Sequence, residues 1–431
     1  MHRLLLVMLV ATLAITRASE AGEPAFQPSS SPDEALHQHH RVPPPDVEVW
    51  WKATGADMAW NNRHLGELLP TVPVYRAGPV RALKSAPDPR IAAFMVDTPK
   101  GRMPFAAFLD GDQSTSFAVV VLHHGQIVFE RYPRMQPYEK PIWWSVSKVF
   151  AASLIALLED RGQVDTAKPV EAYLPELKGT DYEGVTVRNV LDMASGVDCS
   201  DGSYERGSCY YEYEASMDDA VRSAHTADTP YDFLRHLHAG HWAPQGQGFD
   251  YSGVNTFVLS WIVERVMGMR FHDAVSKEYW TRIGPEADAS FLAARHGVAL
   301  SSGGFMSTAR DMARFGLLFT PSWRTVSDRR LVSARYVEAI LHGGRPELLR
   351  NARDPAERTR LAGVRHNAYQ WDLVFDNDDI YKGGWAGQGL LVNPSRDLVA
   401  VYLGYARDDA FSEVEVLPRL RQVLDGLYGR R

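Results

Sequence analysis

The sequence contains one short motif whose residue types and spacing suit nucleophilic catalysis, Ser145-Val146-Ser147-Lys148. Residues three apart share one face of a helix, so the side chains of Ser145 and Lys148 can meet. A serine hydroxyl becomes a good nucleophile when a base takes its proton, and a lysine amine can be that base where burial lowers its pKa. A helix start adds backbone donors and a partial positive charge that stabilise an oxyanion. The motif therefore predicts Ser145 as a nucleophile and Lys148 as its base.

The motif by itself is weak evidence. A Ser-x-x-Lys string is expected about once or twice by chance in a chain of 431 residues. Lys148 is, however, the only lysine of the chain with a serine three residues before it. Its neighbours Trp143-Trp144 and Val149-Phe150 are apolar, as a buried site requires. The alternative interpretation is a surface helix start with an ordinary solvated lysine.

Two later segments carry further groups that can transfer protons or hold charge. Tyr251 lies in the string Phe249-Asp250-Tyr251-Ser252-Gly253, after a glycine-containing loop and before a predicted helix. Lys382 begins the string Lys382-Gly383-Gly384-Trp385 on a predicted strand near the C-terminus. A phenol and a second lysine are both suited to acid–base chemistry.

Strands near both ends of the chain and helices between them must position these motifs. Runs rich in β-branched and aromatic residues predict strands at 117–122, 126–132, 371–375, 380–385, 389–392 and 398–403. Apolar spacing and glycine stops predict helices at 149–161, 187–194, 255–267, 312–319 and 414–428. This order predicts an α+β (α/β) fold, with an antiparallel sheet flanked by helices and a mostly helical insertion at about residues 155–305.

The order of the three motifs resembles the β-lactamase-related serine hydrolases, in which Ser-x-x-Lys precedes Tyr-Ser-x and a late Lys-x-Gly. This superfamily includes class C β-lactamases, D-alanyl-D-alanine carboxypeptidases, family VIII esterases and 6-aminohexanoate-dimer hydrolases. Three other stretches are also similar to family segments: 154–177, 191–197 and 303–311. The resemblance covers roughly residues 80–425 and implies the β-lactamase/transpeptidase-like fold.

The resemblance implies a role for each motif residue. Ser145 is expected to be acylated, and Lys148 and Tyr251 are expected to share the transfer of its proton. The backbone amides of Ser145 and Trp385 are expected to form the oxyanion hole. Lys382 is expected beside the substrate, where it can pair with an anionic group.

Three more residues are expected at the substrate: Gly384, Tyr204 and Asn255. Tyr204 can line the cleft, although ordinary packing explains it equally well. Penicillin-recognising members commonly carry Asn two residues after the tyrosine, where this chain has Gly253. Asn255 can reach that region, although its spacing also suits the following helix. Gly383 likewise replaces the usual threonine, so the chain resembles hydrolases of linear amides and esters more closely than β-lactamases.

Composition excludes several other classes of protein. Hydrophobic residues make up 45% of the chain and charged residues 23%, which is typical of a globular protein. A net charge of −7 argues against a nucleic-acid partner. No apolar run reaches the roughly 20 residues of a transmembrane anchor. Two cysteines cannot supply a four-thiolate zinc site, and no metal is expected.

Residues 1–21 have the form of a signal peptide. His2 and Arg3 give a positive start, Leu4–Ile15 is an apolar run, and small residues favour cleavage after Ala21. The mature protein is therefore expected to be secreted or periplasmic. Residues 22–78 are expected to form an extended N-terminal segment, and residues 79–431 the hydrolase domain.

Export also changes the interpretation of the cysteines. Cys199 and Cys209 lie ten residues apart in a loop rich in Gly, Ser and Asp. In an oxidising compartment such a pair is expected to close a disulfide, with two free thiols as the alternative.

The sequence as a whole predicts an exported serine hydrolase that cleaves a small ester or linear amide through an acyl-enzyme on Ser145, without a cofactor. Two alternatives remain open. One is a β-lactamase or D-alanyl-D-alanine carboxypeptidase, which uses the same chemistry. The other is a non-catalytic sensor or binding module on the same fold, which the presence of all three acid–base groups disfavours.

Overall fold

The computed structural model describes residues 50–355, 361–408 and 416–429. The predicted signal peptide (1–21) and the first part of the predicted extended segment lie outside the described residues. None of the helices in these ranges is both long and apolar enough to cross a membrane.

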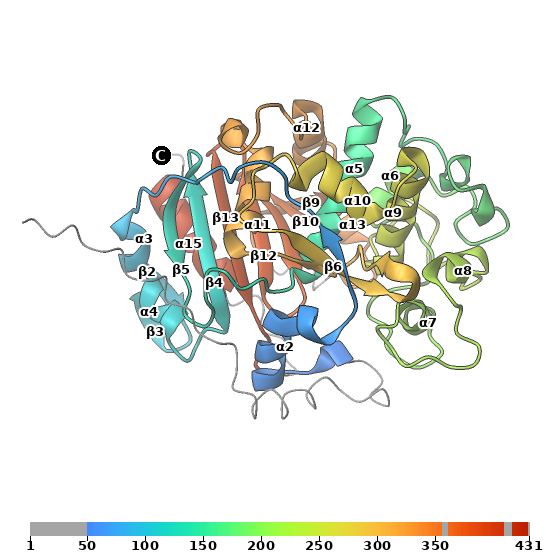
Figure 1. Ribbon diagram of the computed structural model, residues 1–431, viewed down its shortest axis with the longest axis horizontal. Helices are drawn as coiled ribbons and strands as arrows, with labels where there is room; N and C mark the ends of the chain where they lie inside the picture. The colour runs from blue at the N-terminus through green and yellow to red at the C-terminus, as the bar shows by residue number, and fades with distance from the viewer. Residues whose placement is uncertain (1–49, 356–360, 409–415, 430–431) are drawn as a thin grey trace, which may run out of the picture.

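A seven-stranded antiparallel sheet forms the centre of the fold (Figure 1). Its strands follow the order β5 (Gln126–Arg131), β4 (Ser116–His123), β13 (Leu398–Gly404), β12 (Gln388–Asn393), β11 (Ile380–Gly384), β10 (Trp371–Phe375) and β9 (Val364–Ala368). The first two strands come from the N-terminal half of the chain and the other five from its C-terminal end. The predicted strands agree with the observed ones to within one or two residues at each end.

Both faces of this sheet are buried, which explains why its central strands are apolar throughout. Alternate residues of a strand point to opposite faces. On β4, Val119 and Val121 pack in the core beneath α3 (Pro89–Ala93), α4 (Phe105–Asp110) and α15 (Val416–Tyr428). Val120 and Leu122 pack in the larger core, which contains α5 (Lys148–Asp160), α9 (Gly253–Met267) and α11 (Ala309–Gly316).

The region between β5 and β9 is mostly helical, and its helices α5 to α10 lie on the right in Figure 1. It contains α6 (Val187–Leu191), α7 (Cys209–Ser216), α8 (Pro230–Arg235), α10 (Phe271–Val275), α12 (Ala334–His342) and α13 (Pro346–Arg350). The predicted helix at 187–194 ends earlier, at Leu191, because Met193 has a positive φ of 55° that no helix accommodates.

Two smaller sheets were not predicted from the sequence, and one of them includes strands from this mostly helical region. A small sheet joins β1 (Thr71–Val74), β6 (Ala289–Ala294), β7 (Val298–Ala299) and β8 (Phe305–Met306). A separate hairpin is formed by β2 (Met95–Thr98) and β3 (Gly101–Pro104).

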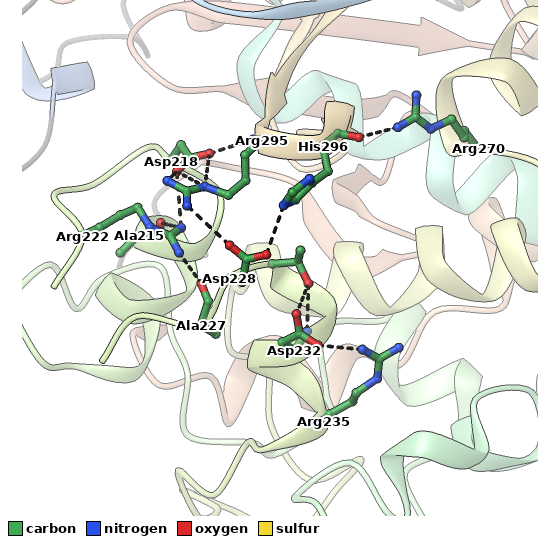
Figure 2. A network of polar contacts seen from close by, with 11 residues as sticks. Ala215, Asp218, Arg222, Ala227, Asp228, Asp232, Arg235, Arg270, Arg295 and His296 are labelled. Carbon is green, nitrogen blue, oxygen red and sulfur yellow. Dashed lines mark hydrogen bonds and ion pairs between the residues drawn. The ribbon is translucent and has the colours of Figure 1, made fainter. Parts of the chain in front are cut away.

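A network of charged side chains fastens α7 and α8 to the turn after β6 (Figure 2). The backbone and guanidinium of Arg295 both donate to Asp218, and His296 Nε2 lies 3.0 Å from Asp228 Oδ2. Arg222 donates to the backbone carbonyl oxygens of Ala215 and Ala227. These contacts fix the segment that follows α7, and α7 itself carries residues of the cavity described below.

The first described segment is folded rather than extended. Residues 55–68 form helix α2 (Gly55–Leu68), and β1 follows it. The apolar periodicity that predicts a helix is broken here because polar Asn61, Asn62 and His64 are among its buried residues. Tertiary contacts, rather than an apolar face, therefore hold α2 in place.

Asn62 connects α2 with two distant parts of the chain. Its side-chain amide donates to Gly404 O at the end of β13, at 3.0 Å. Its side-chain oxygen accepts from Trp144 Nε1 at 3.1 Å, and its backbone oxygen accepts from Ile142 N at 2.8 Å. The N-terminal helix thus braces the segment that leads directly into Ser145.

Candidate active site

Ser145 and Lys148 meet at the start of helix α5, as the motif predicts. Ser145 lies in the 3-10 turn η2 (Trp144–Ser147), and Lys148 is the first residue of α5. Lys148 Nζ lies 3.1 Å from Ser145 Oγ and donates to Ser302 O at 2.8 Å. The lysine side chain is 2% exposed, whereas the serine is half-buried. The hydroxyl is therefore accessible while the amine beneath it is shielded from water.

A constrained turn presents Ser145. Trp144 has a positive φ of 48°, which is rare for a bulky residue; such a conformation costs about 1–3 kcal/mol and persists only where surrounding contacts enforce it. The indole of Trp144 is held by Asn62, and Trp143 N donates to Phe305 O at 2.7 Å. Such strain is typical of functional sites.

Burial lowers the pKa of Lys148, and the nearby carboxylates of Asp201, Asp372 and Glu214 oppose that shift. Asp201 Oδ2 lies 3.9 Å from Lys148 Nζ, within ion-pair distance. A neutral amine can donate one hydrogen to Ser302 O and use its lone pair to accept the hydroxyl proton of Ser145. The arrangement can therefore activate the serine as a nucleophile.

Tyr251 lies between the two lysines of the motifs. Its phenol oxygen accepts from Lys382 Nζ at 2.8 Å. Lys148 Nζ and Lys382 Nζ lie 4.9 and 4.6 Å from the centroid of the tyrosine ring. The backbone of Tyr251 is tied to the loop that carries Asp201, because Asp201 N donates to Tyr251 O at 2.9 Å. The structure thus brings together all three acid–base residues that the sequence singled out.

Lys382 does not lie where the sequence placed it. Its side chain is 0% exposed and forms an ion pair with Asp372, at 2.6 Å between Nζ and Oδ1. Asp372 lines the cavity beside Ser145, whereas Lys382 is not among the lining residues. The ammonium charge expected to meet an anionic substrate is therefore already balanced inside the protein.

Gly384 allows β11 to approach the turn that carries the serine. A Cβ atom at this position would lie 2.4 Å from Trp143 O, which is too close for any side chain. Trp385 follows in the turn between β11 and β12, where Ala386 and Gly387 both have positive φ. Ser145 and Trp385, the two predicted oxyanion-hole residues, consequently line the same cavity.

The cavity has a volume of about 560 Å³. Its walls include these predicted site residues: Ser145, Lys148, Tyr204, Tyr251, Gly384 and Trp385. Asn255 is not among the lining residues. It is 1% exposed, and its side-chain oxygen accepts from Tyr182 OH at 2.8 Å. A Cβ atom on Gly253 would lie 3.2 Å from Tyr210 OH, so a tyrosine occupies the space beside this glycine.

Trp51 is a cavity residue that the sequence did not indicate. Its ring makes edge-to-face contacts with Tyr204 and Trp385, at centroid distances of 4.9 and 5.3 Å. Trp385 Nε1 also donates to Trp51 O at 3.3 Å. No local pattern predicts this position, since the contacts join segments more than 150 residues apart.

Carboxyl groups outnumber cations on the cavity wall. The acidic lining residues are Asp201, Glu214, Asp219, Asp250, Asp354 and Asp372, and the basic ones are Lys148 and Arg353. Burial raises the pKa of Asp201, raises that of Glu214 well above its usual range, and raises that of Asp250 to about 6. Because raised pKa values favour the neutral forms of these three groups, it is the other acidic lining residues, Asp219, Asp354 and Asp372, that make the site better suited to neutral or cationic ligands than to anions.

The structure joins Cys199 and Cys209 by a disulfide, as predicted. The loop that it closes carries Asp201 and Tyr204, both of which line the cavity. Cys199 O also accepts from Ser252 Oγ at 2.6 Å, which ties this loop to the residue after Tyr251. Within the described ranges, no group of three or more His, Cys, Asp or Glu side chains could hold a metal ion.

Comparison with known proteins identifies relatives over most of the chain. A sequence model of the family described as Beta-lactamase matches residues 105–424. A 6-aminohexanoate-dimer hydrolase from Paenarthrobacter ureafaciens is 30% identical over 362 residues, which cover 83% of this chain and 88% of the relative.

Two solved structures show the same fold. One, from Bacillus anthracis, is described as a candidate 6-aminohexanoate-dimer hydrolase; it has a TM-score of 0.73 and 24% identity, covering 88% of this chain and 96% of its own. The other is a family VIII carboxylesterase with a TM-score of 0.53 and 18% identity, covering 70% of this chain and 90% of its own.

Proposed function

The chain belongs to the Beta-lactamase family of serine hydrolases, and on this premise we propose that it cleaves small esters or linear amides through an acyl-enzyme on Ser145. The observation that carries the proposal is the contact between Lys148 Nζ and Ser145 Oγ, 3.1 Å apart beneath an open cavity. A binding module would need neither a buried amine nor a constrained turn at this point.

In the acylation step, the hydroxyl oxygen of Ser145 attacks the substrate carbonyl carbon while its proton passes to the neutral amine of Lys148. The backbone amides of Ser145 and Trp385 stabilise the resulting oxyanion. When the tetrahedral intermediate collapses, the bond to the leaving alcohol or amine breaks. Lys148 and Tyr251 return the proton to that leaving group, so the acyl-enzyme forms without net change of charge.

In the deacylation step, a water molecule attacks the acyl carbon and gives its proton to the same pair of residues. Lys382 donates to the phenol oxygen of Tyr251 and so stabilises negative charge on that oxygen while the proton is away. Collapse of the second tetrahedral intermediate releases the acid and returns the proton to Ser145. No metal or organic cofactor takes part in this cycle.

The cavity supports a neutral or cationic acyl donor. Its acidic wall disfavours anions, and the relative from Paenarthrobacter ureafaciens acts, by its name, on a linear amide dimer. β-Lactams and D-alanyl-D-alanine peptides carry a carboxylate, which would meet Asp372 rather than a free lysine. The alternative as a β-lactamase or carboxypeptidase is accordingly the second candidate.

Export is part of the same proposal. Disulfides persist in oxidising compartments, so the Cys199–Cys209 bond supports a secreted or periplasmic location. The predicted signal peptide, with cleavage after Ala21, provides the route. N-terminal sequencing of the mature protein from cell fractions would test both.

A substrate panel tests the activity. Purified protein and its Ser145→Ala variant are assayed with p-nitrophenyl esters, linear amides including a 6-aminohexanoate dimer, and nitrocefin. Steady turnover of esters or amides that Ser145→Ala abolishes is the expected result. Stoichiometric release of p-nitrophenol without turnover would instead indicate a sensor, and rapid nitrocefin turnover would indicate a β-lactamase.

A further inference from the structure

We propose that Asp372 sets the charge specificity of this site by cancelling the positive charge that Lys382 would otherwise present to the substrate. With the pair intact, neutral acyl groups are preferred over anionic ones of the same size. The inference rests on the proposed function, because it assigns a substrate class to the same cavity.

Strand register makes the two residues direct neighbours. On β10 and β11, Leu373 pairs with Tyr381 and Val374 with Ile380. The same antiparallel register places Asp372 opposite Lys382, with both side chains on one face of the sheet. The 2.6 Å contact is therefore built into the sheet rather than into a loop.

Both carboxylate oxygens of Asp372 are engaged. Oδ1 accepts from Lys382 Nζ, and Oδ2 accepts from Gly383 N at 2.9 Å. Two such contacts fix the orientation of the carboxylate. They also hold the strand end that leads through Gly384 to Trp385.

The two side chains differ in what they show to the cavity. Asp372 is 13% exposed and lines the wall, whereas Lys382 is 0% exposed. An anionic substrate group at this point would approach the carboxylate before the ammonium. Like charges repel strongly where little water is present to screen them.

No other cation is positioned to compensate among the lining residues that the structure describes. Lys148 has Asp201 at 3.9 Å, and Arg353 has Asp198 at 2.6 Å. The two basic residues on the described wall, Lys148 and Arg353, and Lys382 behind it thus each have a carboxylate within ion-pair distance. An anion entering the cavity would find each of these three groups already beside a carboxylate.

Three p-nitrophenyl esters of equal chain length test the proposal: hexanoate (neutral), 5-carboxypentanoate (anionic) and 6-aminohexanoate (cationic). The measured quantity is the ratio of kcat/KM for the anionic ester to that for the neutral ester. In Asp372→Asn this ratio should rise roughly 10- to 100-fold, because the substrate gains a charge-assisted contact with the released lysine. The ratio of kcat/KM for the cationic ester to that for the neutral ester should fall in the same variant.

Two further variants distinguish the effect of freeing Lys382 from the effect of removing any negative charge from the cavity. Asp354→Asn removes one negative charge from the exposed cavity rim and leaves the Asp372–Lys382 pair intact, and it should change the anionic ratio by less than about threefold. The double variant Asp372→Asn/Lys382→Met should lose the gain seen in Asp372→Asn. The proposal would be overturned if the anionic-to-neutral ratio in Asp372→Asn equalled that of the wild type. It would also be overturned if Asp354→Asn raised this ratio as much as Asp372→Asn does, or if the double variant kept the raised ratio.

Lys382→Met alone keeps the proposal testable if Asp372→Asn does not fold. It should lower turnover of all three esters, lower the anionic ratio and raise the cationic ratio, because it leaves the carboxylate of Asp372 unbalanced on the cavity wall. Ratios that stay at the wild-type values would overturn the proposal, because they would show that the charge of this pair does not reach the substrate. A wild-type protein that hydrolyses none of the esters would refute the proposed function, and this inference with it, whereas turnover with unmoved ratios would refute the role of Asp372 alone.

Discussion

Lys148 Nζ lies 3.1 Å from Ser145 Oγ, and the same nitrogen donates to Ser302 O on its other side. The backbone contact holds the lysine where its lone pair can accept the proton of the serine hydroxyl. Burial keeps that lone pair available, because it lowers the pKa of the amine.

Removing the serine should stop the reaction, and removing its partners should not add to that loss. Ser145→Ala should abolish labelling by a fluorophosphonate probe and reduce kcat by several orders of magnitude. Lys148→Ala and Tyr251→Phe should each reduce kcat by about 10²–10⁴. Double variants with Ser145→Ala should be no worse than Ser145→Ala, since residues of one relay act as a unit. Near-normal turnover by Ser145→Ala, with unchanged circular dichroism, would place the site elsewhere.

The pH profile should report the neutral form of Lys148. In the proposed mechanism the neutral amine is the base, so kcat/KM should fall as pH falls through the lowered pKa of this residue. Asp201 opposes the lowering, so Asp201→Asn should move the acidic limb of the profile to lower pH. Lys148→Arg should be inactive at all accessible pH values, because a guanidinium remains protonated.

The matched control for this profile is Asp354→Asn, which removes a carboxyl group from the rim of the same cavity. Its acidic limb should shift less than that of Asp201→Asn. A profile that moves to higher pH in Asp201→Asn would contradict the assignment of the limb to Lys148.

A methyl group at position 384 should damage catalysis more than folding. The Cβ atom of Gly384→Ala would lie 2.4 Å from Trp143 O, so β11 or the serine turn must shift. A displacement near 1 Å can reduce kcat by about 10²-fold, while overpacking costs about 1–3 kcal/mol of stability. Gly66→Ala, in α2 with no atom within 4 Å of its new Cβ, should instead stabilise the protein by about 0.5–1 kcal/mol. Thermal unfolding and ester kinetics distinguish the two effects.

The disulfide should matter for both stability and substrate binding. Closing a loop of this length contributes about 3 kcal/mol in the chain-entropy model, so Cys199→Ser/Cys209→Ser should lower Tm. KM should rise as well, because the loop carries Asp201 and Tyr204. The non-reduced mature protein should weigh about 2 Da less than its dithiol form. Complete labelling by a thiol reagent before reduction would show that the bond is absent.

Trp51 should affect substrate range without affecting the chemical step. Each aromatic pair that Trp51→Ala removes is worth about 0.5–1.5 kcal/mol, so kcat/KM for bulky acyl esters should fall roughly 2- to 10-fold per pair. Trp51→Phe keeps a ring at this position and should retain most of the activity. Labelling of Ser145 by a small fluorophosphonate should proceed at a similar rate in both variants. A large drop of that labelling in Trp51→Ala would mean that the residue supports the nucleophile instead.

The acid–base groups could be predicted from the sequence because each of them lies in a short, recognisable motif. Ser145 and Lys148 share one helical turn, and Tyr251 precedes the start of α9. Six of the seven strands of the central sheet were predicted nearly to the residue, since strands between two buried faces have long apolar runs, whereas β9 and the strands of the two smaller sheets were not predicted. These are local signals, and the structure agrees with them.

The sequence did not predict features that depend on pairing between distant segments. The partner of Lys382 became visible only with the register of β10 and β11, because Asp372 belongs to no motif. Asn255 was expected to reach the region that an asparagine at position 253 would otherwise occupy, but the first turn of α9 directs its side chain toward Tyr182. Helix α2 was missed because buried polar residues replace the apolar face that a helix normally shows.

Trp51 and Asn62 both precede residue 105, at which the match to the family begins. One of them forms part of the cavity wall, and the other braces the turn of the nucleophile. The residues that the family model matches are therefore not the only ones that shape this cavity. Substitutions ahead of residue 105 can alter the cavity wall and the serine turn while Ser145, Lys148 and Tyr251 stay the same.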